Sequence, residues 1–455
     1  MDRDLLRPLA RRVLSLSFVA SIVLLFGFVF AVPGPPARRH PERIPVRFWH
    51  MWTAEWKDIV DRIVLRFNES QDRYEVVALS VPPSSNVDAK FLLAVAGGDP
   101  PDVMAQWKPI IPTWAESHML RPLDDLMSPA ERQRFFDEAY PVAKKIGVYE
   151  NRLYGLPIGI NVWALYYRPE HMREAKLDPD KFPESLEELV LLGAKLDKKN
   201  AHGDIVRLGF LPGWFGMYAP VFGGGFYDWS ARELTLDSPA NLRCLTYLVE
   251  CRKRLGLDVV TRFESAQNAG ASVEWPFISG VFSITLDGQW RVEQLAKYAP
   301  GLEYRVAPIP PPAGGKRFAG SSDGNFMVVP VTAKRPDGAW EFIKFWSGLS
   351  DPERAAAFHT WGGWLPALSS VAKSKTYQDY LARYPSFRVF VDLLSSDNLA
   401  APAPIPYQVF LADRITATDQ AAMRGLVTPT DALRDLVRQV DEERQRRRVL
   451  HYGEP

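Results

Sequence analysis

Tryptophan is the residue type that most clearly indicates a binding function in this chain of 455 residues. Many of its 14 tryptophans lie outside predicted helix cores. Nine of them follow predicted strands or stand in loops: Trp49, Trp52, Trp107, Trp214, Trp229, Trp275, Trp290, Trp361 and Trp364. An indole offers a large apolar face, and ligands of open α/β sheets bind beyond the carboxyl ends of the strands. Nearby Asn, Asp and Glu residues could pair with hydroxyl groups. The pattern favours a sugar ligand, although a tryptophan at such a position can also simply cover a core.

Three other patterns resemble catalytic motifs, and each lacks part of what its chemistry needs. The segment GSSDG at 320–324 matches G-x-S-x-G with Ser322 as the nucleophile, but that motif requires a helix directly after the serine, and here the predicted strand FMVVPV follows. The seven histidines form no HExxH pair, so a catalytic zinc ion is unsupported. The segment GGK at 314–316 lacks the spacing of a phosphate-binding loop. The sequence therefore predicts no metal site and no cofactor.

Composition and charge are those of an ordinary globular protein and give no argument for nucleic acid as a partner. The chain has 55 Lys and Arg residues against 54 Asp and Glu residues, which leaves a formal charge of +1. A nucleic-acid-binding domain would be basic. The two cysteines, Cys244 and Cys251, lie seven residues apart on a predicted helix, about 10 Å from each other. That separation exceeds disulfide reach, so we expect no disulfide.

The first 32 residues are predicted to be a signal peptide or a membrane anchor. Arg3, Arg7, Arg11 and Arg12 precede an apolar run at 13–32, which is long enough to span a bilayer. The segment PGPPARRHPER at 33–43 reads as a linker. We therefore expect the folded part to lie in the periplasm or on the extracellular face of the cytoplasmic membrane.

The elements that must position the tryptophans alternate between strands and helices, which is typical of parallel βαβ units and predicts an α/β fold. The predicted strands cover 44–50, 74–79, 102–107, 162–168, 281–286, 303–308 and 326–331. The predicted helices cover 56–67, 86–96, 184–198, 238–255, 337–348 and 428–447. Trp49, Trp52 and Trp107 fall at or just after the ends of the first and third strands.

The order of several motifs resembles the extracellular solute-binding proteins of ABC sugar importers, the family of maltose-binding protein. The motifs are W-x-x-W after the first strand, FNES, GGDPPDV, YGLPIGINVWALYYRPE, LDGQW, APIPPPAGG and AWEFIKFWSG, and the resemblance covers about residues 44–440. It implies a two-lobed, hinge-connected periplasmic-binding-protein fold of type II that closes on a carbohydrate, without chemistry, and docks on a membrane permease. We expect a monomer.

The lobes expected from this resemblance each combine two segments. The first lobe would contain 44–160 and 306–350, and the second would contain 161–305 and 351–445. Residues 446–455 are expected to form a frayed tail.

The resemblance also implies ligand-binding residues. Trp290 in LDGQW matches the family position where an aromatic ring stacks on the sugar, and Asn161 falls where the maltose-binding relative has a carboxylate. The other expected ligand-binding residues are Trp49, Trp52, Glu55, Trp107, Asp323, Asn325, Trp361, Trp364 and Tyr407. The family usually has an Asn after the tyrosine pair, where this chain has Arg168.

The residues also fit two other functions. An aromatic cleft with two carboxyl groups about 5 Å or about 6.5–9.5 Å apart could hydrolyse glycosides. The candidate carboxylates are Glu55, Glu274, Asp287 and Asp323. Alternatively, the long apolar N-terminal run, with no cysteine nearby for lipid attachment, suits a membrane-tethered sugar sensor without transport.

Overall fold

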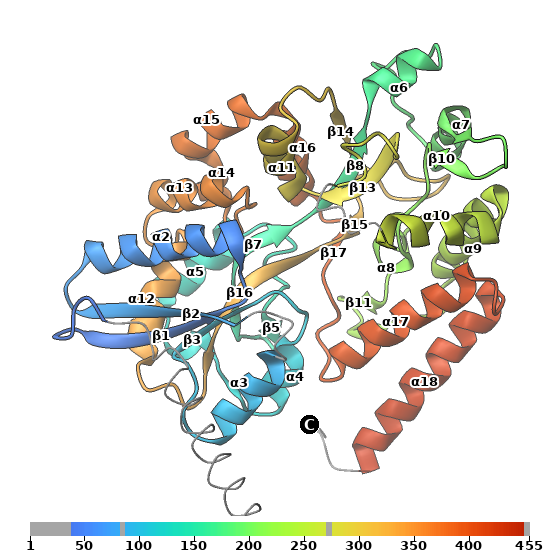
Figure 1. Ribbon diagram of the computed structural model, residues 1–455. Coiled ribbons are helices and arrows are strands. Elements are labelled where there is room, and N and C mark those ends of the chain that lie inside the picture. Colours follow the sequence, from blue (N-terminus) through green and yellow to red (C-terminus); the bar gives the residue numbers. More distant parts are fainter. Residues whose placement is uncertain (1–37, 82–86, 270–274, 450–455) are drawn as a thin grey trace, which may run out of the picture.

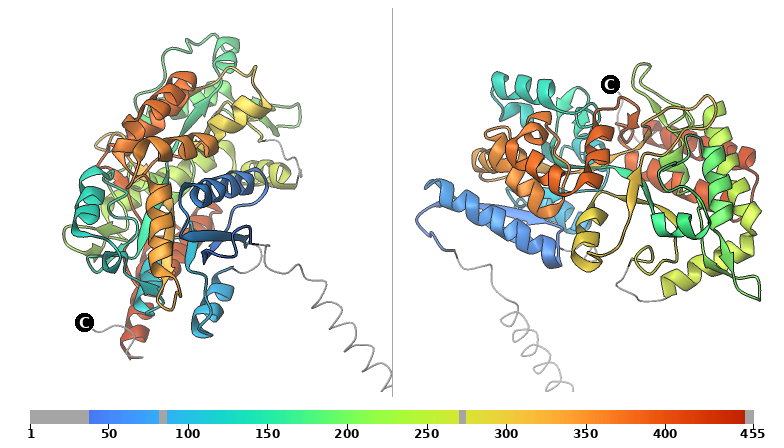
Figure 2. Two further views of the ribbon diagram at one scale, coloured as in Figure 1. Left: turned by 90° about the vertical axis from the view of Figure 1, so that its left-hand side faces the viewer. Right: turned by 90° about the horizontal axis from the view of Figure 1, so that it is seen from above.

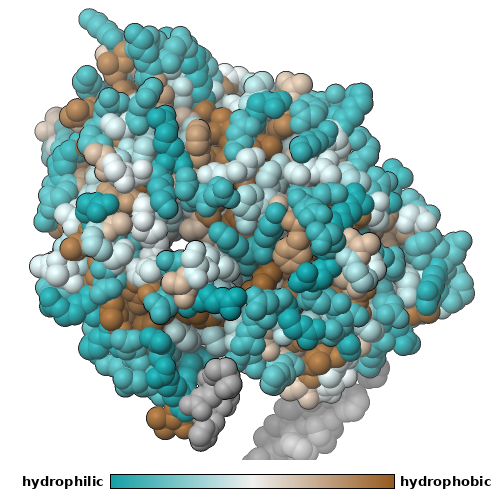
Figure 3. All heavy atoms as spheres, turned by 180° about the vertical axis from the view of Figure 1, so that it is seen from behind, coloured by the Kyte–Doolittle hydropathy of each residue, from teal (hydrophilic) through white to brown (hydrophobic). Residues whose placement is uncertain are grey.

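Two β-sheets organise the protein. The computed structural model describes residues 38–81, 87–269 and 275–449. The larger sheet has six strands in the order β2-β1-β3-β16-β4, with β7 also paired to β16, and the smaller has the order β13-β8-β14 (Figure 1). Helices cover both sheets, and the predicted α/β class is confirmed. The surface seen from behind is mostly hydrophilic, with smaller apolar areas (Figure 3).

The larger sheet places the ends of its parallel strands at one edge. Its strands are β1 (Ile44–His50), β2 (Tyr74–Ser80), β3 (Val103–Gln106), β4 (Leu120–Arg121), β7 (Gly155–Asn161) and β16 (Asp323–Pro330). Strands β1, β2 and β3 are parallel, whereas β16 runs antiparallel to β3, β4 and β7. The connecting helices are α2 (Ala54–Ser70) and α3 (Val87–Ala96). Met51 and Trp107 directly follow β1 and β3, so these chain segments leave the sheet together.

The smaller sheet separates two hydrophobic cores. Its strands are β8 (Trp163–Tyr167), β13 (Ile284–Gly288) and β14 (Arg305–Ala307), and both outer strands are antiparallel to β8. Because side chains alternate along a strand, Ala164 and Tyr166 pack into the larger core while Leu165 and Tyr167 pack into the second core. The second core is covered by α7 (Leu186–Leu196), α9 (Pro239–Leu255), α17 (Gln408–Met423) and α18 (Pro429–Val449).

The larger core continues from one sheet to the other through a layer of helices. These are α11 (Trp290–Tyr298), α12 (Pro336–Ser347), α13 (Pro352–Gly362), α14 (Ser369–Lys373), α15 (Lys375–Arg383) and α16 (Arg388–Leu394). In Figures 1 and 2 the orange helices lie beside α2. Trp346 of α12 is fully buried and stacks on Trp52 and Trp364, with ring centroids 5.7 and 5.8 Å apart. The sheets are therefore joined by packed side chains as well as by the chain.

The remaining elements are short or peripheral. The helices are α4 (Ile111–Glu116), α5 (Pro129–Glu138), α6 (Pro169–Glu174), α8 (Phe215–Tyr218), α10 (Leu257–Ala269) and the 3-10 turns Leu123–Asp125 and Pro385–Phe387. The strands are β5 (Val148–Tyr149), β6 (Arg152–Leu153), β9 (Lys198–Lys199), β10 (Ile205–Arg207), β11 (Tyr227–Asp228), β12 (Glu233–Leu234), β15 (Gly320–Ser321) and β17 (Leu399–Ala400). Cys244 and Cys251 on α9 are buried and unpaired, as expected.

The chain is fixed to the larger sheet before β1 begins. The buried carboxylate of Glu75 accepts hydrogen bonds from Arg38 Nε at 2.9 Å and from the backbone N–H groups of Arg39 and His40. These hydrogen bonds hold the pKa of Glu75 below its usual value, against the effect of burial. Within the described ranges, no helix is long and apolar enough to cross a membrane. The predicted signal or anchor at 1–32, the start of the linker and residues 450–455 lie outside those ranges.

His50, at the end of β1, is a buried polar residue without hydrogen bonds. Its side chain is 1% exposed and lies between Phe48 and Trp52, with ring centroids 5.3 and 5.9 Å away. Neither ring nitrogen finds a hydrogen-bond partner among the residues that the structure describes. Burial lowers its pKa to about 4. A buried polar atom without a partner costs stability.

We predict that His50 makes the protein sensitive to acid. Between pH 6.5 and about 4 this imidazole is protonated in the unfolded chain but not in the folded chain. The free energy of unfolding therefore decreases as the pH is lowered, by up to about 3 kcal/mol from this group. His50→Phe should reduce that slope and raise stability at pH 5, as measured by urea denaturation from pH 4 to 7. The exposed His202→Gln variant should keep the parental slope. An unchanged slope in His50→Phe would contradict the assignment.

Candidate functional site

Tryptophans from both sheets line a cavity of about 330 Å³, here called the aromatic cavity. It is lined by Met51, Trp52, Thr53, Trp56, Trp107, Asn161, Gln289, Trp290, Asn325 and Trp364. The segments after β1 and β3 approach from one side, and the segment after β13 approaches from the other. Every residue in this lining is uncharged. The cavity can therefore offer indole faces and amide groups, but no charged group.

Trp52 and Trp364 are held in the wall of the aromatic cavity by core packing. Their ring centroids are 5.6 Å apart, and both pack on the buried Trp346. Gly363 ends α13 in the left-handed conformation, with φ of 60°, and this turn directs the chain so that the Trp364 N–H donates to the His359 carbonyl at 2.9 Å. In contrast, Trp107 is 40% exposed. Rigid indoles thus form the wall and a more accessible one lies at the opening.

Trp290, the first residue of α11, lies against the backbone of Gly288. A Cβ atom at position 288 would come within 2.2 Å of the Trp290 ring, so only glycine permits this placement. The Trp290 ring meets Trp163 edge-on at 5.8 Å, and Trp163 in turn meets Trp214 edge-on at 6.0 Å. These three residues form a row, here called the tryptophan row.

The far end of the tryptophan row lines a second cavity, of about 360 Å³, here called the polar cavity. Its lining includes Trp214, Tyr227 and Trp229 together with four charged residues, Lys145, Lys316, Asp323 and Asp397. Lys145 lies over the Trp229 ring, 5.4 Å from its centroid. The polar cavity therefore combines aromatic faces with two cations and two carboxylates.

Asn161 and Asp323 connect the two cavities. Asn161 ends β7 and lines the aromatic cavity, whereas Asp323 begins β16 and lines the polar cavity. Asn161 Nδ2 donates to Asp323 Oδ1 at 2.7 Å. Burial raises the pKa of Asp323 to about 6, and the hydrogen bond from Asn161 opposes that rise. At neutral pH the carboxylate is therefore largely ionised.

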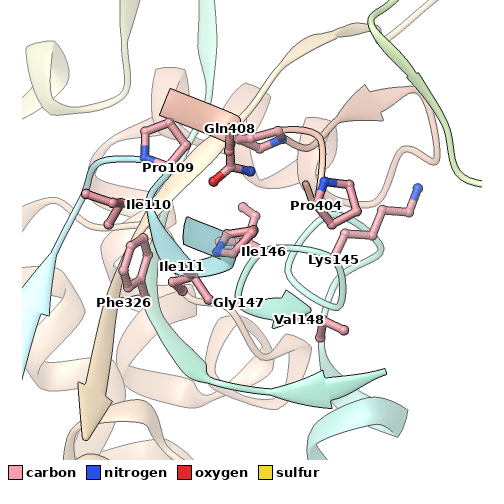
Figure 4. Close-up of a pocket in the computed structure, with 12 residues that line it drawn as sticks. Pro109, Ile110, Ile111, Lys145, Ile146, Gly147, Val148, Phe326, Pro404 and Gln408 are labelled. Atoms are coloured by element: carbon pink, nitrogen blue, oxygen red, sulfur yellow. The ribbon is translucent and has the colours of Figure 1, made fainter. Parts of the chain in front are cut away.

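A third hollow is too small for a sugar. It lies beside the polar cavity and is lined mainly by apolar residues such as Ile111, Ile146 and Phe326 (Figure 4). Its volume is about 20 Å³, which is about the space that one water molecule needs.

The structure brings seven of the eleven expected ligand-binding residues to the two cavities. They are Trp52, Trp107, Asn161, Trp290, Asn325 and Trp364 in the aromatic cavity and Asp323 in the polar cavity. Four others lie elsewhere: Trp49, Glu55, Trp361 and Tyr407.

Each of those four has a different neighbour. Trp49 packs against the larger core, and Trp361 lies under the Arg62 guanidinium, 3.6 Å from its ring centroid. Glu55 forms an ion pair with Lys297 of α11. Tyr407 packs against the second core, while residues one helical turn further along α17 line the polar cavity.

Several lining residues were not expected from the sequence. Trp56 falls in a predicted helix rather than in a loop, but it stands in the first turn of α2, and this end of the helix faces the aromatic cavity. Gln289 lies in the motif LDGQW, directly before Trp290. Its place between Gly288 and Trp290 was the available signal, because a residue next to a ligand-facing ring must lie near the same cavity.

The catalytic alternatives find no support in the geometry. Ser322 is 1% exposed, lies between the strands β15 and β16, and its Oγ donates to the Asn161 carbonyl at 2.8 Å. Asp287 is paired with Arg291 at 2.8 Å, and Glu274 lies outside the described residues. Among the residues that can be described, no three His, Cys, Asp or Glu side chains are placed to hold a metal ion.

The chain is similar to several known proteins in sequence and in fold. The sn-glycerol-3-phosphate-binding periplasmic protein UgpB of Yersinia pseudotuberculosis is 23% identical over 377 residues, which cover 80% of this chain and 82% of the relative. The structure of CpMnBP1 with mannotriose bound superposes with a TM-score of 0.73 at 26% identity and covers 87% of this chain and 99% of that one. The sugar-binding protein MalE of Xanthomonas citri gives 0.72 at 22% identity, with 90% and 100% covered.

The fold is therefore the α/β periplasmic-binding-protein fold seen in MalE. The family model for bacterial extracellular solute-binding proteins matches residues 62–385, which is most of the chain. Members of this family bind solutes and are not enzymes, so the glycoside hydrolase alternative is set aside. The chain belongs to the bacterial extracellular solute-binding protein family.

Proposed function

We propose that this protein binds a neutral oligosaccharide in a cleft formed by the aromatic and polar cavities, and delivers it to the permease of an ABC importer. The observation that carries the proposal is the uncharged lining of the aromatic cavity, where indoles stand beside the amides of Asn161 and Asn325. Amides can both donate to and accept from sugar hydroxyls. Indole faces suit the C–H face of a sugar ring.

The same lining argues against glycerol phosphate, the ligand named for the UgpB relatives. A phosphate group is normally bound by Arg or Lys side chains or by a helix N-terminus. The aromatic cavity has no cationic side chain in its lining. The polar cavity contains Lys145 and Lys316, but it also contains Asp323 and Asp397, which would repel a phosphate.

The tryptophan row supports a ligand of more than one sugar unit. Trp290 borders the aromatic cavity and Trp214 borders the polar cavity, with Trp163 between them. The volume of each cavity lies at the lower end of the range for small-molecule binding sites, so each cavity alone has room for only a small ligand. A sugar unit in each cavity, linked across Trp163, would use both. This reading agrees with the mannotriose bound to CpMnBP1.

Ligand binding would favour closure of the two lobes. Trp52 and Trp107 follow strands of the larger sheet, while Trp290 and Trp214 belong to the side of the smaller sheet. Only a closed form contacts the ligand from both sides, so binding shifts the population toward it. The ion pair between Glu55 and Lys297 joins α2 to α11, but both side chains are solvent-accessible. Such pairs contribute at most about 1 kcal/mol, so the ligand must supply most of the closing free energy.

We predict that Trp290→Ala lowers oligosaccharide affinity at least tenfold, because the cavity loses its stacking face. Isothermal titration calorimetry on residues 38–455 measures the change. The matched control is Trp361→Ala, which removes an indole outside both cavities and should leave affinity unchanged. Parental affinity in Trp290→Ala, or an equal loss in both variants, would refute the site.

A ligand panel tests the proposed ligand class. Mannotriose and maltotriose should bind at least tenfold more tightly than mannose, glucose or sn-glycerol 3-phosphate, because only a longer neutral ligand reaches both cavities. Intrinsic tryptophan fluorescence should report saturable binding, and chromatography should recover the sugar unhydrolysed. Tighter binding of sn-glycerol 3-phosphate than of every oligosaccharide would contradict the proposal.

A further inference from the structure

Gln289 makes a set of hydrogen bonds whose direction is fixed by the backbone. Its Oε1 accepts from the Val162 N–H at 3.1 Å, and its Nε2 lies 3.2 Å from the Ile160 carbonyl. A backbone N–H can only donate and a carbonyl can only accept. The amide of Gln289 is thus held in one orientation, and it is 1% exposed.

The fixed Gln289 amide in turn orients the side chain of Asn161, which is hydrogen-bonded to Asp323. Gln289 Nε2 also donates to Asn161 Oδ1 at 3.3 Å, so the amide nitrogen of Asn161 must face the other way. That nitrogen donates to Asp323 Oδ1 at 2.7 Å. Asp323 must therefore present an acceptor to Asn161.

Two groups remain available for a ligand at the ends of this chain of hydrogen bonds. Asn161 Nδ2 has a second hydrogen, and this residue lines the aromatic cavity. Asp323 Oδ2 makes no hydrogen bond to any residue in the described part of the protein, and Asp323 lines the polar cavity. One cavity is given an N–H donor and the other a carboxylate acceptor.

We propose that Gln289 is a positioning residue that, together with the Asp323 carboxylate, holds the Asn161 donor toward the ligand, and so determines which ligand hydroxyls the two cavities accept. The proposal rests on the function proposed above, because it assumes that a ligand occupies both cavities. Gln289 stands directly before Trp290, while Asn161 and Asp323 belong to the larger sheet. The hydrogen bonds therefore orient polar groups from one side relative to the stacking ring from the other.

Two further hydrogen bonds hold the backbone around Asn161. Ser322 Oγ donates to the Asn161 carbonyl at 2.8 Å, and the Ile160 N–H donates to the Leu365 carbonyl at 2.9 Å. These bonds hold the backbone on both sides of Asn161 but leave its amide free to turn. The Gln289 amide and the Asp323 carboxylate together distinguish the two orientations of that amide, because Gln289 donates to its oxygen and Asp323 accepts from its nitrogen. The charged groups that share the polar cavity with Asp323 are Lys145, Lys316 and Asp397.

Three variants test the proposal at pH 8. In Gln289→Glu an oxygen replaces Nε2 and faces Asn161 Oδ1, while turning the Asn161 amide would point its oxygen at the Asp323 carboxylate, so either orientation places two acceptors against each other. In Asp323→Asn the group facing the polar cavity becomes a donor. Each single variant should bind the best oligosaccharide of the panel at least tenfold more weakly than the parent. In the double variant the turned Asn161 oxygen meets the amide introduced at position 323, and an acceptor again faces the polar cavity, so most of the lost affinity should return.

The matched control is Gln294→Glu, which adds the same charge on α11, where Gln294 accepts a hydrogen bond from Arg291. It should retain parental affinity. A double variant that binds as weakly as the product of the two single losses would overturn the proposal. Parental affinity in Gln289→Glu would also overturn it.

A measurement without ligand separates this proposal from the proposed function. By urea denaturation at pH 8, Gln289→Glu should be less stable than the parent, and adding Asp323→Asn should restore part of the loss. If no sugar binds the parent, the proposed function fails, and the stability comparison still decides the role of Gln289. If sugar binds but the double variant rescues neither affinity nor stability, only the role of Gln289 fails.

Discussion

The structure depends on hydrogen bonding where the chain passes between its two sheets. Asn161 ends β7, Asp323 begins β16, and Leu365 follows α13, so three chain segments meet at one place. They are joined by the backbone hydrogen bond from Ile160 to Leu365 and by the hydrogen bond from the Ser322 hydroxyl to the Asn161 carbonyl. Buried backbone groups that lacked these partners would cost free energy. The same hydrogen bonds hold the backbone next to Asn161 and Asp323.

Aromatic packing supplies rigidity around this junction. Trp346 is fully buried and holds Trp52 and Trp364, which face the aromatic cavity, so the wall of this cavity is the outer surface of the core. On the other side, Gly288 allows the Trp290 ring to lie on the backbone. A rigid stacking surface loses little conformational freedom on binding, which favours affinity. The charged side chains line the polar cavity instead.

Much of the fold could be predicted from the sequence because its signals are local. The period of apolar residues located α2, β1, β2 and α12 to within a few residues, and the motif order indicated the family that the comparisons confirm. The strand β7 was not predicted. It is buried along almost its whole length and so shows no alternation of apolar and polar residues. The free cysteines followed from helix geometry alone.

The candidate site was only partly predictable, and its residues show why. Sequence determined which segments carry tryptophan and amide groups, and a motif singled out Trp290. Only the tertiary structure decided that Trp361 turns toward Arg62 while Trp364, three residues later, enters the cavity beyond the turn at Gly363. Likewise Glu55 pairs with Lys297, and Gln289 contacts a strand more than 120 residues away in sequence. Periodicity specifies which face of an element is buried. The direction of a side chain at the end of an element depends on contacts with distant residues, which no local pattern contains.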